Sequence, residues 1–423
     1  MVQFNTLLTV YLGLFLLALL GRLLLTGLNV GHLRRVGDKV PAVFNGLIDG
    51  DTMTRMRNYT VDSSRFASVE EVTMDAVTLM ILLSGFLPWM VDVLDVLSLP
   101  FVPSGLLFFG ILALISGLAS LPFNLYGTFV IERRYGFSTI SFKLWLIDLF
   151  KGIVITALLM GMLLGAFLTL IQYAPRSWWF WVWLVYASFQ MLMVWLYPMV
   201  IAPLFNRYEP VGNDSLREAI VAMMARVGLK TEGVFQVDEG RRSRHSNAYF
   251  TGLGSTKRIV LYDTLLASHS DDEILAILSH EIGHWKKRHV LKQLLFMEAA
   301  SLCVFYLAWR LINWEMLYQT FGIEQVVPYA GLLLLAVLFE PLTFFLTPLA
   351  SLVLRRFERE ADAFSLQLLG EKASALASAL KRLAKDNLAN LHPHPLYAGF
   401  YYTHPPLVER IARIEGEASK KGP

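Results

Sequence analysis

The sequence has little charge and almost no cysteine. Only 17% of its 423 residues are charged, 55% are hydrophobic, and the mean hydropathy is +0.50. Soluble globular domains are about 45–50% apolar. The composition therefore excludes an ordinary soluble protein and predicts a multi-pass protein of the lipid bilayer. The one cysteine, Cys303, excludes an intramolecular disulfide.

Other features are also missing. The net charge of +3 is not gathered in a basic patch, so nucleic acid is not an expected partner. Residues 1–5 lack the basic start of a cleavable signal peptide, and residues 421–423 do not form a C-terminal lipidation box. No internal repeat, low-complexity tract or flexible linker is evident. The chain is therefore classified from its long apolar runs.

Seven apolar runs are long enough to cross the hydrocarbon layer, which takes about 20 helical residues. They cover residues 5–26, 76–98, 104–127, 149–172, 177–202, 290–312 and 326–353. Nine basic residues lie in the connections after the first and third runs, whereas the opposite side has two, Arg176 and Arg310. The positive-inside rule then places the N-terminus outside and the C-terminus in the cytoplasm.

The spans divide the chain into four expected regions. Residues 1–202 form an N-terminal membrane region of five spans, 203–289 a cytosolic region, 290–353 spans six and seven, and 354–423 a C-terminal helical region. In the cytosolic region we expect an amphipathic helix near 214–227 and three β-like runs at 233–237, 247–251 and 258–262, with a turn at Gly252 and Gly254. These runs predict a small β-sheet. The C-terminal region is expected to be helical at 355–369 and 405–417.

The sequence SHEIGHW at 279–285 carries the expected chemistry. His280 and His284 are four residues apart, so a helix places both imidazoles on one face, with Glu281 beside them. This is the spacing of a catalytic zinc site, in which zinc activates a water molecule and the glutamate takes its proton. Residues 268–272 offer a cap for this helix, which we expect to continue without a break into the sixth span.

Two histidines are not enough for a catalytic zinc site, because a third protein ligand is expected. The stretch after the seventh span offers three carboxylates, Glu358, Glu360 and Asp362. Glu358 and Asp362 are four apart and share a helix face, whereas Glu360 points elsewhere. Arginines interleave with these carboxylates, so a solvated charged surface is the alternative that this stretch alone leaves open.

Taken together, these motifs resemble the CAAX prenyl protease type 1 family, integral membrane zinc endopeptidases of the gluzincin group. H-E-x-x-H is followed by E-x-x-x-D after the last span. Further family-like pieces occur in the same order: LPFNLY at 121–126, TFVIE at 128–132, IAPLFN at 201–206, SNAYFTG at 246–252 and THPPLVER at 403–410. The likeness covers nearly the whole chain. It implies a zinc metalloendopeptidase that holds one Zn²⁺ per chain and cleaves peptide or protein substrates, with or without a prenyl group.

The resemblance also implies roles for particular residues. Glu358 is implied as the third zinc ligand, and Asp362 as the group that orients a ligand histidine. Glu281 is implied as the catalytic base, with His404 and Arg410 near the scissile carbonyl. An edge strand that binds extended substrate is implied for Asn247, Ala248, Tyr249 and Phe250. An ordinary half-buried hairpin is the alternative for that strand.

Other polar residues are expected to lie outside this centre. Four histidines are rivals for ligand roles, but a lone histidine is more often a surface or hydrogen-bonded residue: His245, His289, His392 and His394. Four acidic residues within the apolar runs are candidates to line a water-filled interior, since charges in lipid are costly without water or partners: Asp92, Asp95, Glu298 and Glu340.

Two other functions remain open. A heat-shock-type quality-control membrane protease carries a related zinc motif but usually has fewer spans and lacks the long N-terminal half. A seven-span transporter or receptor with structural histidines does not account for the large cytoplasmic region before span six. The favoured interpretation is a monomeric, multi-pass α-helical membrane zinc metalloendopeptidase with its active site on the cytoplasmic side. Its membrane would be the inner membrane of a prokaryote or the endoplasmic reticulum of a eukaryote.

Overall fold

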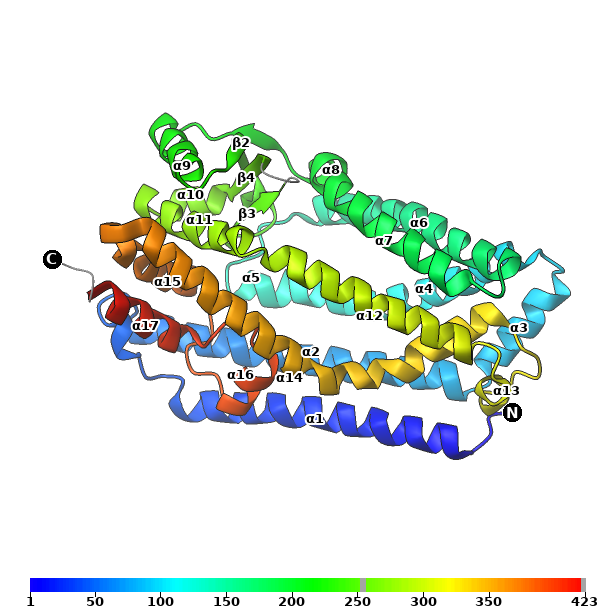
Figure 1. Cartoon of the computed structure of the whole chain (residues 1–423). Helices are drawn as coiled ribbons and strands as arrows, with labels where there is room; N and C mark the ends of the chain where they lie inside the picture. Colours follow the sequence, from blue (N-terminus) through cyan, green and yellow to red (C-terminus); the bar gives the residue numbers. More distant parts are fainter. Residues whose placement is uncertain (252–255, 420–423) are drawn as a thin grey trace.

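The computed structural model describes residues 1–251 and 256–419, and its long helices run side by side (Figure 1). Within these residues, six helices are long and apolar enough to cross a membrane. They are Thr6–Val36 (α1), Phe101–Arg134, Phe142–Tyr173 (α6), Trp178–Phe205, His289–Leu311 (α12) and the helix that begins at Pro328. The expected multi-pass α-helical architecture is therefore confirmed.

The second predicted span is a bent pair of helices and not one straight helix. Gly50–Leu83 (α2) and Phe86–Val96 (α3) meet at 57° and make a seventh crossing if they count as one. Gly85 between them has a φ of +82°. Glycine adopts this left-handed conformation without steric cost, which permits the sharp bend.

Two spans contain a π-helical turn near their C-terminal ends. Phe101–Arg134 consists of Phe101–Tyr126 (α4), the turn Gly127–Ile131 and Glu132–Arg134 (α5). Trp178–Phe205 consists of Trp178–Leu196 (α7), the turn Tyr197–Ile201 and Ala202–Phe205 (α8). Such turns often mark functional sites, and both overlap stretches that carry the family resemblance.

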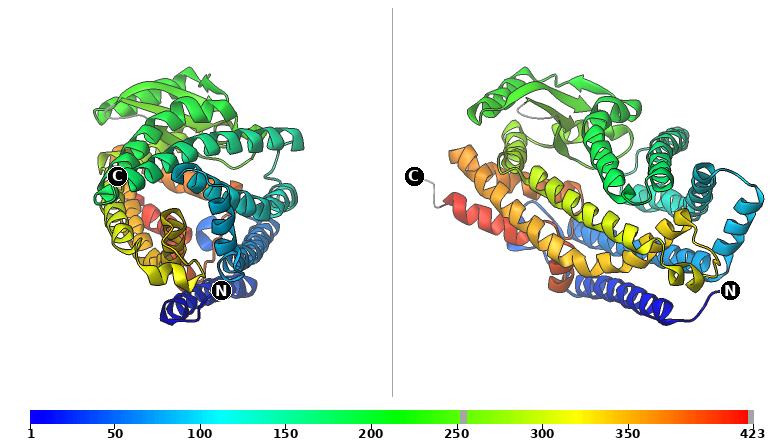
Figure 2. Two further views of the ribbon diagram at one scale, coloured as in Figure 1. Left: turned by 90° about the vertical axis from the view of Figure 1, so that its right-hand side faces the viewer. Right: turned by 45° about the vertical axis from the view of Figure 1, so that its right-hand side comes forward.

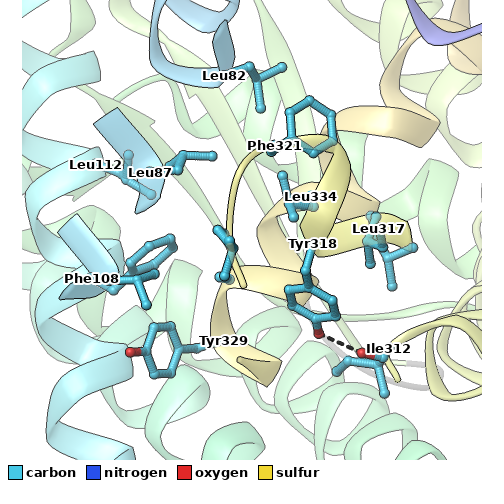
Figure 3. Packing of buried hydrophobic residues seen from close by; sticks show 14 of the residues in the cluster. Leu82, Leu87, Phe108, Leu112, Ile312, Leu317, Tyr318, Phe321, Tyr329 and Leu334 are labelled. Carbon is cyan, nitrogen blue, oxygen red and sulfur yellow. Dashed lines mark hydrogen bonds between the residues drawn. The ribbon is translucent and has the colours of Figure 1, made fainter. Parts of the chain in front are cut away.

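A dense apolar core closes the end of the bundle away from the sheet (Figure 3). Tyr318 on Glu315–Thr320 (α13) is buried there, and its hydroxyl donates to the carbonyl oxygen of Ile312. Buried side chains from four further helices join this core: Leu82, Leu87, Phe108 and Leu334. Between helices in lipid, such a core stabilises the fold through close van der Waals packing and not through removal of apolar area from water. This core holds the helices together at the end opposite the sheet.

A polar cavity of about 310 Å³ lies farther along the bundle, among α1, α2, Pro328–Leu369 (α14) and Pro395–Tyr401 (α16). Arg22 on α1 reaches Glu71 at 2.5 Å and Asp75 at 2.6 Å, both on α2. Glu340 lines the same cavity, whereas Asp92 is exposed at the end of the bundle. Pairing with Arg22 offsets the cost of placing carboxylates inside a span.

A four-stranded sheet lies at the other end of the bundle (Figures 1 and 2). Its strands are Tyr208–Pro210 (β1), Lys230–Val237 (β2), Ala248–Thr251 (β3) and Thr256–Tyr262 (β4), in the order β1-β2-β4-β3. β2 pairs in parallel with β4, and β3 pairs antiparallel with it. The three predicted runs correspond to β2, β3 and β4. The predicted turn at Gly252 and Gly254 lies outside the described residues.

Helices surround this sheet and complete the same end of the molecule. Asp214–Arg226 (α9) buries Leu216, Ile220, Met223 and Met224, as its helical spacing predicts. Asp263–Ser268 (α10) and Asp271–Lys286 (α11) follow β4. Pro328–Leu369 (α14) has 42 residues, about 63 Å at 1.5 Å per residue, so one helix both spans the membrane and reaches the sheet end.

Three further helices follow α14. They are Ser374–Asp386 (α15), Pro395–Tyr401 (α16) and Leu407–Ser419 (α17). Only α17 is predicted from the sequence. α16, with seven residues, is too short to show a helical period. α15 does bury residues at helical spacing, Leu376, Ala377, Leu380 and Ala384, so a usable signal for it is present.

Candidate metal centre

The motif helix α11 begins at a full capping box. The Glu273 carboxylate accepts a hydrogen bond from Ser270 N–H at 2.9 Å, and Ser270 Oγ accepts one from Glu273 N–H. This pair satisfies two of the free N–H groups at the helix start. One side of α11 packs into the core beneath the sheet through Ile274, Leu278 and Ile282. Another side packs against α14.

The motif helix does not run into the sixth span, so the expectation of an unbroken helix is wrong. α11 ends at Lys286, and Arg288 takes a φ of +57° before α12 begins at His289. A non-glycine residue in this region is uncommon, because its Cβ crowds the backbone. The resulting turn redirects the chain and brings His289 back against His284.

Three side chains from α11 and α14 converge on one point. His280 Nε2 lies 3.1 Å from His284 Nε2, and the Glu358 carboxylate lies 3.3 Å from the first and 3.2 Å from the second. Ligands placed about 2.0–2.1 Å from a tetrahedral zinc ion are about 3.3 Å from one another. The separations in this group therefore suit zinc.

The state of the carboxylate supports the same conclusion. Glu358 Oε2 is buried, and although His280 Nε2 and His404 Nε2 each lie 3.3 Å from it, neither of these described residues forms a well-directed hydrogen bond with it. Leaving a buried charged oxygen without a partner is costly, so such atoms normally have a donor or meet a cation. The three residues thus fit a divalent metal in both geometry and charge.

A close helix crossing brings Glu358 to the histidines. A Cβ added at Gly283 would lie 2.9 Å from both the Cα and the carbonyl oxygen of Ala361 on α14. One turn away in each helix, Ser279 and Ser365 are hydrogen bonded to each other. Only small residues permit this approach, so Gly283 sets the distance between the histidine pair and the carboxylate.

We therefore expect Gly283→Ala to weaken both the fold and zinc binding. The added methyl group must push α14 away at a residue adjacent to Asp362, and overpacking of this kind costs about 1–3 kcal/mol. Zinc content and the thermal unfolding midpoint measure the effect. Gly416→Ala is the matched control, because nothing lies within 4 Å of a Cβ at that α17 position. Unchanged zinc affinity in Gly283→Ala would show that the crossing does not set the site.

The imidazole of His280 is held from behind by a buried ion pair. His280 Nδ1 lies 2.9 Å from Asp362 Oδ1, and the Asp362 side chain is fully buried. Arg410 donates to both oxygens of this carboxylate, from Nε at 2.9 Å and from Nη2 at 2.7 Å, and Arg413 adds a third bond at 3.0 Å. A carboxylate acceptor at Nδ1 keeps the hydrogen there and leaves the Nε2 lone pair directed at Glu358.

His404 and Arg410, the two residues expected near the scissile carbonyl, lie in different environments. His404 Nε2 is 3.3 Å from Glu358 Oε2, and its side chain is 57% exposed. The Arg410 side chain is only 6% exposed and is occupied by Asp362. His404 is therefore open to an incoming molecule, whereas Arg410 is buried, with its Nη2 3.4 Å from His280 Nε2 and 3.7 Å from Glu358 Oε2.

Glu281 lies next to the metal-binding group without being part of it. Burial raises the pKa of its carboxyl, and the nearby His280 and His284 act in the opposite direction. The converging atoms come from His280, His284 and Glu358 alone. This position agrees with the prediction that Glu281 exchanges protons and does not bind the ion.

The predicted substrate strand is an edge strand in the described part of the sheet. Tyr262 N–H donates to Asn247 C=O, and antiparallel alternation then turns the backbone groups of Ala248 and Phe250 away from β4. The N–H of Ala248 is occupied by the Asn247 side chain at 2.8 Å. Phe250 N–H and C=O therefore face the open edge of a strand that contacts α11. Tyr249 has its hydroxyl 3.2 Å from that of Tyr208.

The rival histidines occupy four different settings. Three make hydrogen bonds elsewhere: His245 with Glu132 and Asn387, His392 with the carbonyl of Lys39, and His394 with the N–H of Leu396 at the start of α16. His289 instead contacts His284 itself, which spacing does not indicate, because residues five apart in a helix do not share a face.

A second contributor also escapes detection from the sequence. Arg355 on α14 donates to the carbonyl oxygen of Tyr402 at 2.6 Å and so ties down the loop that carries His404. No spacing rule links an arginine to a backbone group 47 residues later.

Known proteins resemble the chain over both the membrane helices and this centre. Residues 29–207 match the CAAX prenyl protease N-terminal region of five membrane helices, and residues 210–418 match peptidase family M48. CAAX prenyl protease 1 of Saccharomyces cerevisiae is 33% identical over 409 residues, which cover 90% of each chain. The Homo sapiens homolog is 31% identical and covers 89% of this chain and 88% of its own. The crystal structure of S. mikatae Ste24p aligns with a TM-score of 0.90 at 30% identity, over 98% of this chain and 100% of that one.

Proposed function

Because the chain belongs to the CAAX prenyl protease family of M48 peptidases and is a membrane zinc metalloprotease, we propose that His280, His284 and Glu358 hold its zinc ion. The observation that supports this assignment is the spacing of the three ligand atoms, which all lie within 4.8 Å of one another. Such a group binds one ion, so the proposed stoichiometry is one zinc per chain.

The proposed reaction is hydrolysis of an internal peptide bond. When bound, zinc polarises the substrate carbonyl and activates the attacking water. Glu281 accepts a proton from that water as its oxygen attacks the carbonyl carbon, and then delivers the proton to the leaving amine nitrogen. His404, exposed beside Glu358, donates to the oxyanion.

The buried ion pair behind His280 has a supporting role in this proposal. Asp362 holds the ligand imidazole, and Arg410 holds Asp362. Arg410 Nη2 also lies 3.4 Å from His280 Nε2 and 3.7 Å from Glu358 Oε2, so the expected place of Arg410 near the scissile carbonyl stays a prediction beside this positioning role. Arg410 would then affect metal affinity more than substrate binding.

Substrate is proposed to lie along the open edge of β3. A peptide added there pairs with Phe250 N–H and C=O through its own main chain, which suits many sequences. The neighbouring motif helix α11 contacts this strand, so a peptide on the edge passes close to the metal ligands.

We expect Phe250→Pro to lower kcat/KM more than Phe250→Ala does. Both variants remove the aromatic ring, but only proline removes the outward N–H, and an edge position tolerates proline otherwise. One substrate hydrogen bond contributes about 0.5–1.5 kcal/mol, or roughly 2- to 13-fold in kcat/KM. Equal kcat/KM values for the two variants, measured on one peptide, would contradict pairing at this residue.

The active site is proposed to face the cytoplasm. The sheet, the motif helix α11 and the helices α15 and α17 lie at one end of the bundle, and the N-terminus lies at the other (Figure 1). The excess of basic residues after the first and third spans supports a cytoplasmic position for the sheet end. The chain would then act as a monomer in the inner membrane of a prokaryote or the endoplasmic reticulum of a eukaryote. The four expected regions would divide at residues 202, 289 and 353.

The relatives are CAAX prenyl proteases by name, and we propose that this chain cleaves a prenylated C-terminal peptide in the same way. A farnesylated peptide and its unmodified twin test the proposal, with and without a zinc chelator. Faster cleavage of the farnesylated peptide is expected, and chelation should abolish cleavage until zinc is restored. Equal rates on both peptides would replace prenyl specificity with general endopeptidase activity, and chelator-resistant cleavage would refute the zinc mechanism.

A further inference from the structure

The second ligand histidine, His284, also has a hydrogen-bonding partner at the ring nitrogen that does not face Glu358. That partner is another histidine. His284 Nδ1 lies 3.2 Å from Nδ1 of His289, the first residue of α12. The two rings meet edge to face, at 77° with centroids 5.1 Å apart. On its far side, His289 Nε2 lies 3.2 Å from Glu360 Oε2. The three side chains therefore form a row that ends at a ligand of the proposed zinc.

The chemistry of these groups gives the row a direction. An ionised carboxylate only accepts hydrogen bonds, so the hydrogen of neutral His289 lies on Nε2, toward Glu360. His289 Nδ1 is then an acceptor, and it receives the hydrogen on Nδ1 of His284. With its hydrogen on Nδ1, His284 keeps a lone pair on Nε2. This is the nitrogen that faces His280 and Glu358.

His289 is held tightly enough to impose this arrangement. Its side chain is fully buried. Its ring stacks on Phe357 of α14, with centroids 4.3 Å apart and planes at 10°. Glu360 also accepts a hydrogen bond from Arg356 one turn earlier, at 3.2 Å. The ring therefore has little freedom to turn away from His284.

The helix geometry explains why an extra ring is needed. Asp362 shares a face of α14 with Glu358 and reaches His280 directly. Glu360 lies two residues from each and points about 200° away, so its carboxylate does not reach His284 without a bridge. His289 supplies that bridge because the left-handed residue Arg288 turns the chain back at the start of α12.

We propose that His289 is a positioning residue for the metal ligand His284, and that Glu360 acts through His289. The inference rests on the zinc site proposed above. Outer partners of ligand histidines typically affect metal affinity by about 10- to 100-fold. His289 thus does for His284 what Asp362 does for His280, with an imidazole inserted between the ligand and its carboxylate.

Four single variants of the full-length protein in detergent, and two double variants that combine Glu360→Ala with a substitution of His289, test this role. His289→Phe keeps a ring to stack on Phe357 but lacks the acceptor. His289→Asn places an amide oxygen at the Nδ1 position and so preserves the acceptor. Glu360→Ala removes the last member of the row at a partly exposed position, and His392→Phe is the control, because that histidine bonds to the carbonyl of Lys39. The measurements are zinc affinity by competition with a chromogenic chelator and the visible spectrum of the Co²⁺-substituted protein.

In His289→Phe, we expect zinc affinity to fall by about 10- to 100-fold and the Co²⁺ spectrum to shift. In His289→Asn and in the control, we expect zinc affinity to stay within threefold of that of the parent protein. Glu360→Ala should weaken binding less than His289→Phe. It should have no additional effect when combined with His289→Phe, because Glu360 has no other path to the metal.

The results separate the inference from its premise. Parent-like zinc affinity in His289→Phe, or equally weak binding in His289→Asn and His289→Phe, would overturn the role of His289. An undiminished effect of Glu360→Ala in the His289→Phe background would overturn the relay. Failure of the unmodified protein to bind zinc would instead overturn the proposed metal site. If His289→Phe does not fold, zinc affinity is compared between His289→Asn and the double variant His289→Asn/Glu360→Ala. A further loss of zinc affinity in the double variant would contradict the relay through His289.

Discussion

Replacing Glu281 with glutamine is expected to leave zinc in place and to lower kcat by about 10²- to 10⁴-fold, the usual contribution of a general base. Glutamine matches the size of glutamate but does not accept the proton of the attacking water. The metal should remain, because the converging ligand atoms belong to His280, His284 and Glu358. Elemental analysis for zinc and single-substrate kinetics on one peptide measure the two effects.

The control for this variant is Asp272→Asn in the first turn of the same helix. Asp272 is exposed and pairs with Lys372, so neither zinc content nor kcat should change. Loss of zinc from Glu281→Gln would assign Glu281 to the metal instead. Full turnover with zinc bound would exclude it as the base.

Replacing Glu358 with alanine is expected to release the zinc ion, whereas replacing Glu360 is not. Without Glu358 the site keeps two imidazoles, one ligand short of the three protein ligands of a catalytic zinc centre. The Glu358 oxygens lie 3.2 and 3.3 Å from the ligand nitrogens, whereas Glu360 faces His289 and Arg356. At saturating metal, Glu360→Ala should still hold about one zinc per chain, although with lower affinity.

Zinc content after removal of loosely bound metal distinguishes the two variants. Thermal unfolding with and without added zinc is the second readout, since a ligand that binds only the folded state raises the unfolding midpoint. Zinc should therefore stabilise Glu360→Ala but not Glu358→Ala. Zinc-loaded Glu358→Ala beside metal-free Glu360→Ala would reverse the assignment of the third ligand.

These expectations concern a site whose parts come from distant segments. α11 supplies the histidines and the base, α14 the carboxylates, and the C-terminal residues the groups that surround them. Gly283 allows the first two elements to approach closely. A substitution that alters this crossing should therefore affect metal binding even though it changes no ligand.

Several features follow from the sequence alone, because they depend on local chemistry. An apolar run of about 20 residues has one favourable location, which is the bilayer, and the spans are found on this basis. The spacing of His280 and His284 places them on one face of any α-helix. The cap of that helix, Ser270, falls within the expected residues 268–272, since capping depends on a few neighbouring residues.

Other features were decided by the tertiary structure. Spacing shows that Glu358 and Asp362 share a face of α14 and that Glu360 does not. Which of these faces meets the histidines depends on how α14 is rotated against α11. The packing of Gly283 against Ala361 sets that rotation. The place of His289 depends on one left-handed residue, Arg288, which no periodicity predicts. Local sequence determines how side chains are arranged along one helix. The contacts between helices determine how one helix is turned toward another, and a metal site built across two helices depends on both.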